Sequence, residues 1–212
     1  MKPVVIGVKM HSGWGILVAV SGSLDSVEIA ERRRIVITDA TLPRANQPYH
    51  HAATLGLPEA ERHLVRCTTV SERLSSAAIS EAIEAMAKRD YRVVGAALLL
   101  ASGRSLPSLP EILGAHPLIH TAEGEFFRCA VRKAFDRLKV PVTGIRERDL
   151  ARFAETVLGD AAGPLQSAIA GSGSYLGPPW TKDHKMAAFA AAILLNNHAL
   201  GLSPHPTSYP RF

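Results

Sequence analysis

The order of the apolar segments is the feature that most constrains the fold of this chain. Three short apolar runs come first, joined by glycine-containing turns, at 4–8, 16–20 and 27–37. Consecutive strands joined in this way are typical of an antiparallel meander. Two further apolar runs follow, 93–100 and 142–145, and helical patterns separate them. The order predicts an α/β fold with a five-stranded mixed sheet, in which the first, fourth and fifth strands run parallel, and with helices on both faces.

Capping residues and apolar periodicity predict where the helices lie. Thr69 and Glu72 have the spacing of a capping box, and Thr121 and Thr181 each precede a helical pattern. We expect helices at 58–66, 69–89, 121–138 and 147–158, a last helix after Thr181, and loops at 102–113 and 171–180.

The length and composition favour a single globular domain. The chain has 212 residues, of which 47% are hydrophobic and 20% charged, and this profile is neither disordered nor membrane-spanning. No internal repeat or linker interrupts it. We expect one domain over 1–212, with a proline-containing insertion at about 40–69 and an irregular tail at about 201–212.

No segment has the pattern of a membrane anchor or a secretion signal. Lys9 and His11 interrupt the first apolar run, and the apolar segment 186–195 is too short to cross about 30 Å of hydrocarbon. The two cysteines, Cys67 and Cys129, form neither a disulfide framework nor a zinc motif. We therefore expect a cytoplasmic protein that does not enter a membrane.

The chain is mildly basic, with a formal net charge of +5 and an isoelectric point near 9.5. A basic surface attracts polyanions such as nucleic acid. A solvated charged face would look the same in the sequence. The basic residues gather in three clusters: Arg32, Arg33 and Arg34; Arg146, Arg148 and Arg152; and Lys182 and Lys185.

The order of elements resembles the ribonuclease H-like superfamily, which includes the Holliday-junction resolvases. The resemblance covers most of the chain. It implies a ribonuclease H-like fold, a role on nucleic acid and the use of Mg²⁺ or Mn²⁺. The stretches His-Thr-Ala-Glu-Gly-Glu and Gly-Pro-Pro-Trp also resemble uncharacterised bacterial proteins, which implies no function. Three stretches resemble the family's first hairpin, a resolvase helix with the strand after it, and the final resolvase helix: Val5-Ile-Gly-Val-Lys-Met-His-Ser-Gly-Trp-Gly15, Ala122-Glu-Gly-Glu-Phe-Phe-Arg128 through Val140-Pro141-Val142, and Lys182-Asp183-His184-Lys185.

The sequence departs from the family pattern at the metal ligands. Nucleases of the family place Asp on the first strand, because two magnesium ions need carboxylate oxygens to bridge them. Lys9 stands there instead. The fourth strand, whose end often carries another acid in these nucleases, runs into Ala101-Ser102-Gly103. The usual two-metal set therefore cannot be assembled from matching positions.

Two acids near helix starts are candidates for a different metal site. Glu123 and Asp183 are expected near the ends of the central strands, where open sheets bind ligands. They would hold one divalent ion together with Glu125 or His120. Alternatively, acids in a first helical turn simply complement the helix dipole. His116 precedes His120 by four residues, but Pro117 argues against a regular helix there, so this pair also fits a loop that hydrogen-bonds backbone.

Lys9, His11 and Ser12 lie on or beside a glycine turn, a combination that favours an anion such as phosphate. The alternative is a Lys9 ion pair with Glu123 or Asp183, as the remnant of a lost active site. We predict that the Lys9 ammonium lies within direct or water-bridged reach of one of these acids.

Two functions stay open. One is a divergent metal-dependent phosphodiesterase with Lys9, Glu123 and Asp183 in its active site. The other is a non-catalytic relative that binds nucleic acid or a protein partner. A phosphotransfer protein of the actin-like branch is disfavoured, because the chain has room for one copy of the domain and lacks the second phosphate loop. In either case we expect these residues to contact nucleic acid: His11, Arg104, Arg146, Arg148, Lys182 and Lys185.

Overall fold

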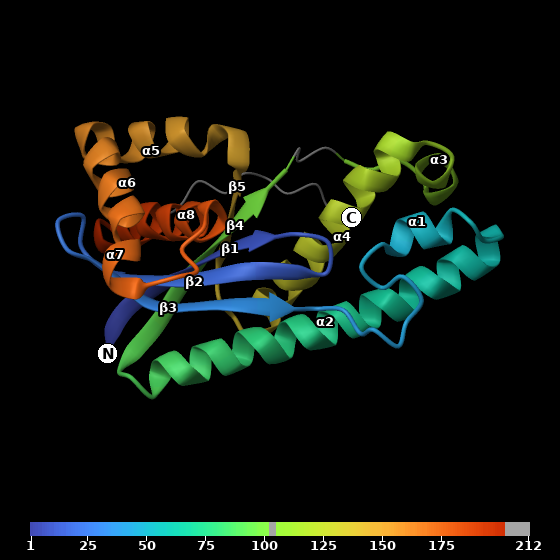
Figure 1. Cartoon of the computed structure of the whole chain (residues 1–212), viewed down its shortest axis with the longest axis horizontal. Coiled ribbons are helices and arrows are strands. Elements are labelled where there is room, and N and C mark those ends of the chain that lie inside the picture. Colours follow the sequence, from blue (N-terminus) through green and yellow to red (C-terminus); the bar gives the residue numbers. More distant parts are fainter. Residues whose placement is uncertain (102–104, 202–212) are drawn as a thin grey trace.

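A computed structural model describes residues 1–101 and 105–201 of the chain, and its centre is a five-stranded mixed sheet (Figure 1). The strand order is β3-β2-β1-β4-β5. The second strand runs antiparallel to both neighbours, whereas the first, fourth and fifth run parallel. The predicted fold class and strand directions are confirmed. The strands are β1 (Lys2–Met10), β2 (Trp14–Gly22), β3 (Val27–Val36), β4 (Tyr91–Leu100) and β5 (Val142–Arg146).

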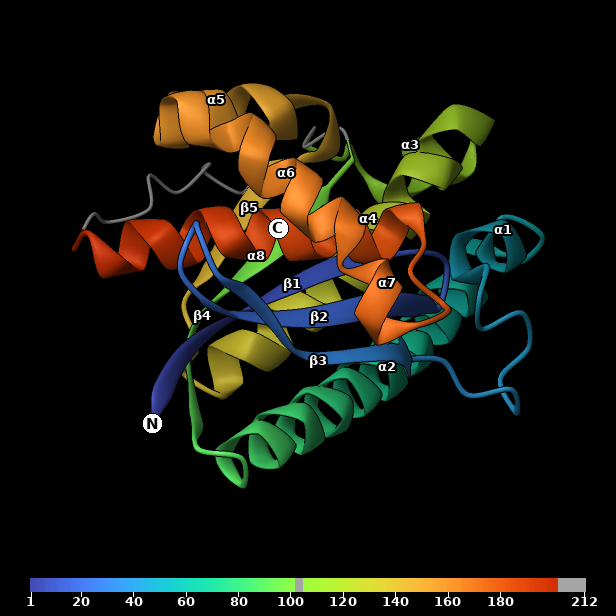
Figure 2. The same cartoon turned by 60° about the vertical axis from the view of Figure 1, so that its left-hand side comes forward.

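Helices cover both faces of the sheet (Figure 2). α2 and α4 pack on one face, and α8, with α5 and α6 outside it, packs on the other. Two 3₁₀ helices, Glu147–Asp149 and Gly159–Ala161, flank α5. No helix in the described ranges is long and apolar enough to span a membrane. The α-helices are α1 (Pro48–Ala52), α2 (Leu57–Ala87), α3 (Leu109–Leu113), α4 (His116–Arg137), α5 (Leu150–Leu158), α6 (Ala162–Gly171), α7 (Gly173–Leu176) and α8 (Lys182–Ala199).

The alternation of side chains along β1 divides the core into two layers. Val4, Ile6 and Val8 face α2 and α4, whereas Val5 packs against α8. Successive strand residues point to opposite faces, so Lys9 lies on the same face as Val5, under α8. This alternation decides which acids the Lys9 ammonium can reach.

The boundary predicted between helices at 66–69 is wrong, because α2 runs unbroken from Leu57 to Ala87. Thr69 caps nothing, and its hydroxyl donates to the Val65 carbonyl one turn back, at 3.0 Å. A buried stripe continues across the supposed break from Leu64 through Cys67 to Ser71. Burial of a continuous stripe stabilises one long helix more than a local cap stabilises a new start.

The start predicted for the next helix is also wrong. α4 begins at His116, with Pro117 in its first turn, where the missing N–H of proline has no helical partner to lose. Thr121 lies inside the helix and donates to the Pro117 carbonyl at 3.0 Å. The helix start predicted at Thr181 is confirmed, because Thr181 is the N-cap of α8 and forms a capping box with His184.

The expected loops contain more helix than predicted. α3 occupies the end of the segment 102–113, and α7 with the last residue of α6 occupies the first half of 171–180. The expected insertion at 40–69 holds α1 and the start of α2. Most of the expected tail, 201–212, lies outside the described residues, as does Arg104.

Candidate functional site

Lys9 lies between two carboxylates at the carboxyl end of β1. Its ammonium is 2.5 Å from Glu147 Oε2 and 4.0 Å from Asp183 Oδ1, and its side chain is 11% exposed. Glu147 opens the 3₁₀ helix after β5, and Asp183 lies in the first turn of α8. The predicted contact between Lys9 and Asp183 is present. The sequence analysis missed Glu147, because nothing in its local pattern distinguishes it from a surface acid.

His11 extends this cluster toward a row of ring and guanidinium groups. Its Nε2 is 2.9 Å from Asp183 Oδ2, and its ring stacks on Trp14 with centroids 4.2 Å apart and planes at 14°. The Arg34 guanidinium lies 4.6 Å from the Trp14 ring centroid, which is a cation–π contact. The Nε2 atom of His11 is thus already in contact with a carboxylate.

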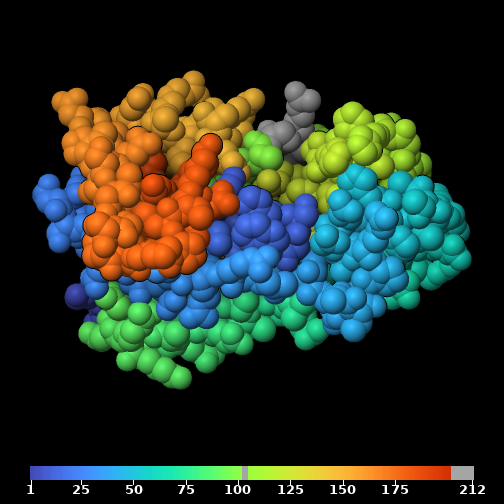
Figure 3. All heavy atoms as spheres, viewed as in Figure 1, coloured from blue at the N-terminus to red at the C-terminus, as the bar shows by residue number. Residues whose placement is uncertain are grey.

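A groove of about 500 Å³ continues from Asp183 across β2 and β3. The Arg32 guanidinium holds the segment 176–179 at one wall of the groove, because it donates hydrogen bonds to the carbonyls of Leu176, Gly177 and Pro179 at 2.7–2.8 Å. The surface of the β1–β2 turn (blue) is exposed between the orange segment near residue 175 and the cyan segment of α1 (Figure 3). The groove is lined by apolar, basic and capping residues and by one acid, Asp183: Trp14, Ile16, Arg32, Arg33, Arg34, Pro179, Thr181, Asp183 and His184.

Two of the other basic residues expected to contact nucleic acid lie in ion pairs within the chain. Arg146 pairs with Asp149 at 2.5 Å, and the exposed Arg148 lies 3.8 Å from the same carboxylate. Lys182 and Lys185 line a separate depression, together with Glu147 and several apolar residues. Lys182 is exposed and Lys185 half-buried, so the Lys182 ammonium is the more accessible of the two to a phosphate.

His184 anchors the start of α8 in its neutral form. Its Nδ1 is 2.8 Å from the Thr181 hydroxyl and 3.3 Å from the Thr181 backbone nitrogen, which donates to it. Burial lowers the pKa of His184 below its ordinary value, and nearby Arg32 lowers it further, whereas Asp183 opposes the shift. The native fold therefore favours the unprotonated ring.

This shift predicts that acid weakens the fold. A histidine whose pKa is lower in the native state contributes its full stability above the unfolded pKa of about 6.5 and loses it as the pH falls below that value. We expect the free energy of unfolding, measured by urea titration from pH 8 to pH 5, to decline below about 6.5. His184→Gln, which keeps a capping acceptor, should reduce this decline, whereas the exposed His198→Gln should leave it unchanged. Equal declines in both variants would contradict the assignment.

Glu123 and Glu125 do not join the Lys9 cluster. α4 packs against the face of β1 opposite to Lys9, so its acids cannot converge with Asp183 on one ion. Glu123 instead accepts hydrogen bonds from the Tyr49 and His50 backbone nitrogens at 3.1 and 3.4 Å. Glu125 is buried and pairs with Arg128 at 3.2 Å. The site expected from Glu123 and Asp183, with Glu125 or His120 as a further ligand, is thus not assembled.

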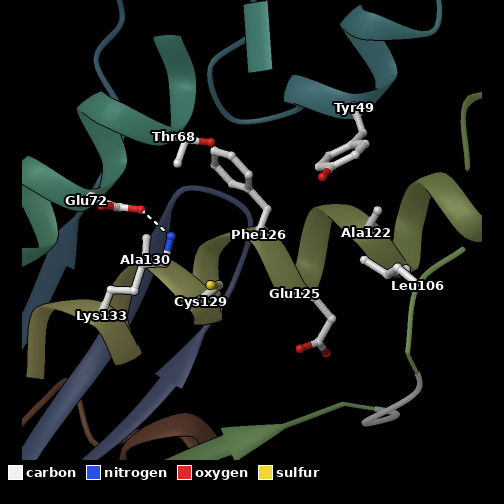
Figure 4. Close-up of a pocket in the computed structure, with 10 residues that line it drawn as sticks. All are labelled: Tyr49, Thr68, Glu72, Leu106, Ala122, Glu125, Phe126, Cys129, Ala130 and Lys133. Atoms are coloured by element: carbon white, nitrogen blue, oxygen red, sulfur yellow. Dashed lines mark hydrogen bonds and ion pairs between the residues drawn. The ribbon is translucent and has the colours of Figure 1, made fainter. Parts of the chain in front are cut away.

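A separate pocket of about 190 Å³ lies between α1, α2 and α4 (Figure 4). Tyr49, Phe126 and Cys129 line it, and the ion pair of Lys133 with Glu72, at 2.8 Å, stands at its edge. Burial raises the pKa of the Tyr49 hydroxyl. A protonated phenol and apolar walls are typical of packing, and three charged groups of the lining are already in ion pairs, Lys133 with Glu72 and Glu125 with Arg128.

The sheet order and the helices on both faces define an α/β protein with a ribonuclease H-like fold. No family model matches the chain. No curated protein matches it either. The solved structure of Thermus thermophilus RuvC in complex with a Holliday junction substrate is similar, with 13% identity over 93% of this chain and 96% of that chain and a TM-score of 0.51. A second T. thermophilus RuvC structure matches with the same identity and coverage and a TM-score of 0.49.

Proposed function

We propose that this chain binds nucleic acid through the groove beside Lys9, and that Lys9 takes the place of a metal ion at the end of β1. The observation that carries this proposal is the Lys9 ammonium held 2.5 Å from Glu147 and 4.0 Å from Asp183. A protonated lysine neutralises carboxylates as a cation does, but it neither activates water nor stabilises a departing oxygen. Of the two functions that the sequence left open, we favour the non-catalytic one at this position.

The fold comparison supports the choice of ligand. The similar RuvC structure was solved with a Holliday junction substrate, so this fold can present a surface to DNA. A fold hosts many functions, however, and the argument for binding therefore rests on the groove itself. The Trp14 ring is held between His11, which stacks on it, and the Arg34 guanidinium, so a base would stack on this ring by displacing one of the two. Arg34 adds a charge there, with no acid paired to it among residues 1–101 and 105–201.

These groups suit a ligand with bases and phosphates. Aromatic rings stack on bases whatever their identity, and basic side chains follow the phosphate backbone. Lys182 and Lys185 lie in the first turn of α8, as do the groove residues Asp183 and His184, and add two further positive charges there. We therefore propose electrostatic binding with little sequence preference, strengthened where an unpaired base can stack on Trp14.

The salt dependence of binding tests this proposal. Each phosphate contact adds about one unit to the slope of log affinity against log salt. The double variant Lys182→Gln/Lys185→Gln should lower this slope by up to about two units between about 50 and 200 mM NaCl, measured by fluorescence anisotropy with labelled oligonucleotides. The control Lys88→Gln removes an exposed charge after α2, at the other end of the sheet, and should leave the slope unchanged.

Trp14→Leu separates stacking from charge in the same assay. We expect weaker binding of a single strand by about 1–3 kcal/mol and a smaller loss with a duplex, whose bases are already stacked. The salt slope should stay the same in this variant. An affinity that barely responds to salt, or equal effects of the Lys88 control and the double variant, would overturn the proposal.

A further inference from the structure

Three histidines come together where α1 meets the first turns of α4. His116 and His120 are one helical turn apart, and their Nε2 atoms are 3.0 Å from each other. His50, on α1, faces both rings, with ring centroids 5.4 Å and 4.7 Å away. One ligand nitrogen from each of the three rings lies within 4.8 Å of the other two. Side chains from two elements distant in the sequence thus direct their nitrogens toward one point.

A buried carboxylate orients His50. Glu123 is 4% exposed, and its Oε2 lies 2.7 Å from His50 Nδ1. A carboxylate accepts hydrogen bonds and donates none, so His50 Nδ1 is the donor of this contact, and in the neutral ring the lone pair is then on Nε2. The other oxygen of Glu123 accepts the Tyr49 and His50 backbone N–H groups, which fixes the carboxylate itself. A carboxylate behind a ligating imidazole is the usual support of a protein metal centre.

The spacing of the nitrogens fits a transition metal ion. A tetrahedral zinc ion with Zn–N bonds of about 2.0–2.1 Å holds its ligand nitrogens about 3.3 Å apart. The His116–His120 pair, at 3.0 Å, is already close to this spacing, and the ligand nitrogen of His50 lies within 4.8 Å of both. Two facing imidazole nitrogens share one hydrogen at most, whereas one ion accepts a lone pair from each of the three rings.

We propose that His50, His116 and His120 bind a divalent transition metal ion such as zinc, and that Glu123 positions His50 for this role. Imidazole nitrogen favours zinc, copper and nickel, whereas magnesium and calcium favour oxygen ligands. His116 and His120 are exposed, so a fourth coordination position stays open to water, as in catalytic zinc sites. This site is independent of the groove and of Lys9, and it would also join α1 to α4.

The test uses the full chain without a polyhistidine tag, stripped with EDTA and dialysed at pH 7.5. Isothermal titration with ZnCl₂ should give one ion per chain, and CoCl₂ should give the visible absorption of a low-symmetry, four- or five-coordinate cobalt ion. Zinc at about 100 times its dissociation constant should raise the melting temperature by about 5–10 °C. MgCl₂ should have neither effect.

Variants identify the ligands. His116→Gln and His120→Gln change exposed side chains, so the fold should persist while the cobalt spectrum and the melting shift disappear. Glu123→Gln should weaken zinc binding about 10–100-fold. His198→Gln, an exposed histidine at the end of α8, is the matched control and should bind zinc normally. Zinc binding that survives both ligand variants, the absence of binding, or a preference for magnesium would each overturn the proposal.

Discussion

Gly7→Ala is expected to destabilise the protein by about 3 kcal/mol or more, the upper end of the usual cost of overpacking a core. A Cβ atom at Gly7 would lie 1.9 Å from the Ala187 carbonyl oxygen of α8 and 2.6 Å from its carbonyl carbon. Neither atom belongs to a flexible side chain, so relief requires β1 or α8 to shift as a whole. α8 can approach this closely because it presents small buried side chains, such as Ala188 and Ala191, around the contact.

Urea unfolding followed by circular dichroism measures this effect. Gly95→Ala is the matched control, because it adds the same methyl group to the neighbouring strand β4, where the nearest atom, the Pro141 carbonyl oxygen, is 3.6 Å away. The control should change the free energy of unfolding by less than about 1 kcal/mol. Equal losses in the two variants would show that α8 does not press on β1 in this way.

The sheet could be predicted because its signals are local. Each strand is a short apolar run, and the turns between the first three contain glycine, so the number and the directions of the strands followed from the sequence. The boundaries of the helices were harder to predict than the strands. At Thr69 a capping pattern occurs by chance inside a stripe that stays buried, and only the tertiary packing of α2 decides between the two.

The candidate sites depended on which face each side chain occupies. The contact of Lys9 with Asp183 could be predicted, since both were expected at the same edge of the sheet. Glu123 could not be excluded without knowing that α4 covers the opposite face of β1. The histidine cluster was hidden for two reasons. Pro117 starts a helix rather than breaking one, and His50 comes from a segment whose place in the fold has no signal in the sequence.

Lys9→Met and Lys9→Asp should differ in a way that shows what Lys9 replaces. Lys9→Met leaves Glu147 and Asp183 facing each other without a cation. Breaking a fully buried ion pair costs about 3–5 kcal/mol, but these acids are 30% and 23% exposed, so we expect a loss of about 1–3 kcal/mol. Lys2→Met is the control, because it breaks an ion pair with Glu28 that is largely exposed and should cost less than about 1 kcal/mol.

Lys9→Asp should be the least stable variant in EDTA, because three carboxylates then lie close together at the carboxyl end of β1 and repel one another. Carboxylate oxygens are the ligands that Mg²⁺ and Mn²⁺ prefer, so added MnCl₂ should raise the melting temperature of Lys9→Asp. The wild type and Lys9→Met should not respond in this way. Adding Glu147→Gln to Lys9→Asp removes one ligand and should abolish the response.

Manganese bound at the histidine cluster would also raise the melting temperature. Each variant is therefore compared in the His120→Gln background, where that cluster lacks one of its three histidines. If manganese stabilises Lys9→Asp there and the wild type stays indifferent, the Lys9 ammonium stands where a metal ion would otherwise bind. If Lys9→Asp ignores manganese, the cluster of Glu147 and Asp183 lacks the geometry of a metal site. Lys9 would then be an ordinary structural cation, and the proposal that it takes the place of a metal ion would be wrong.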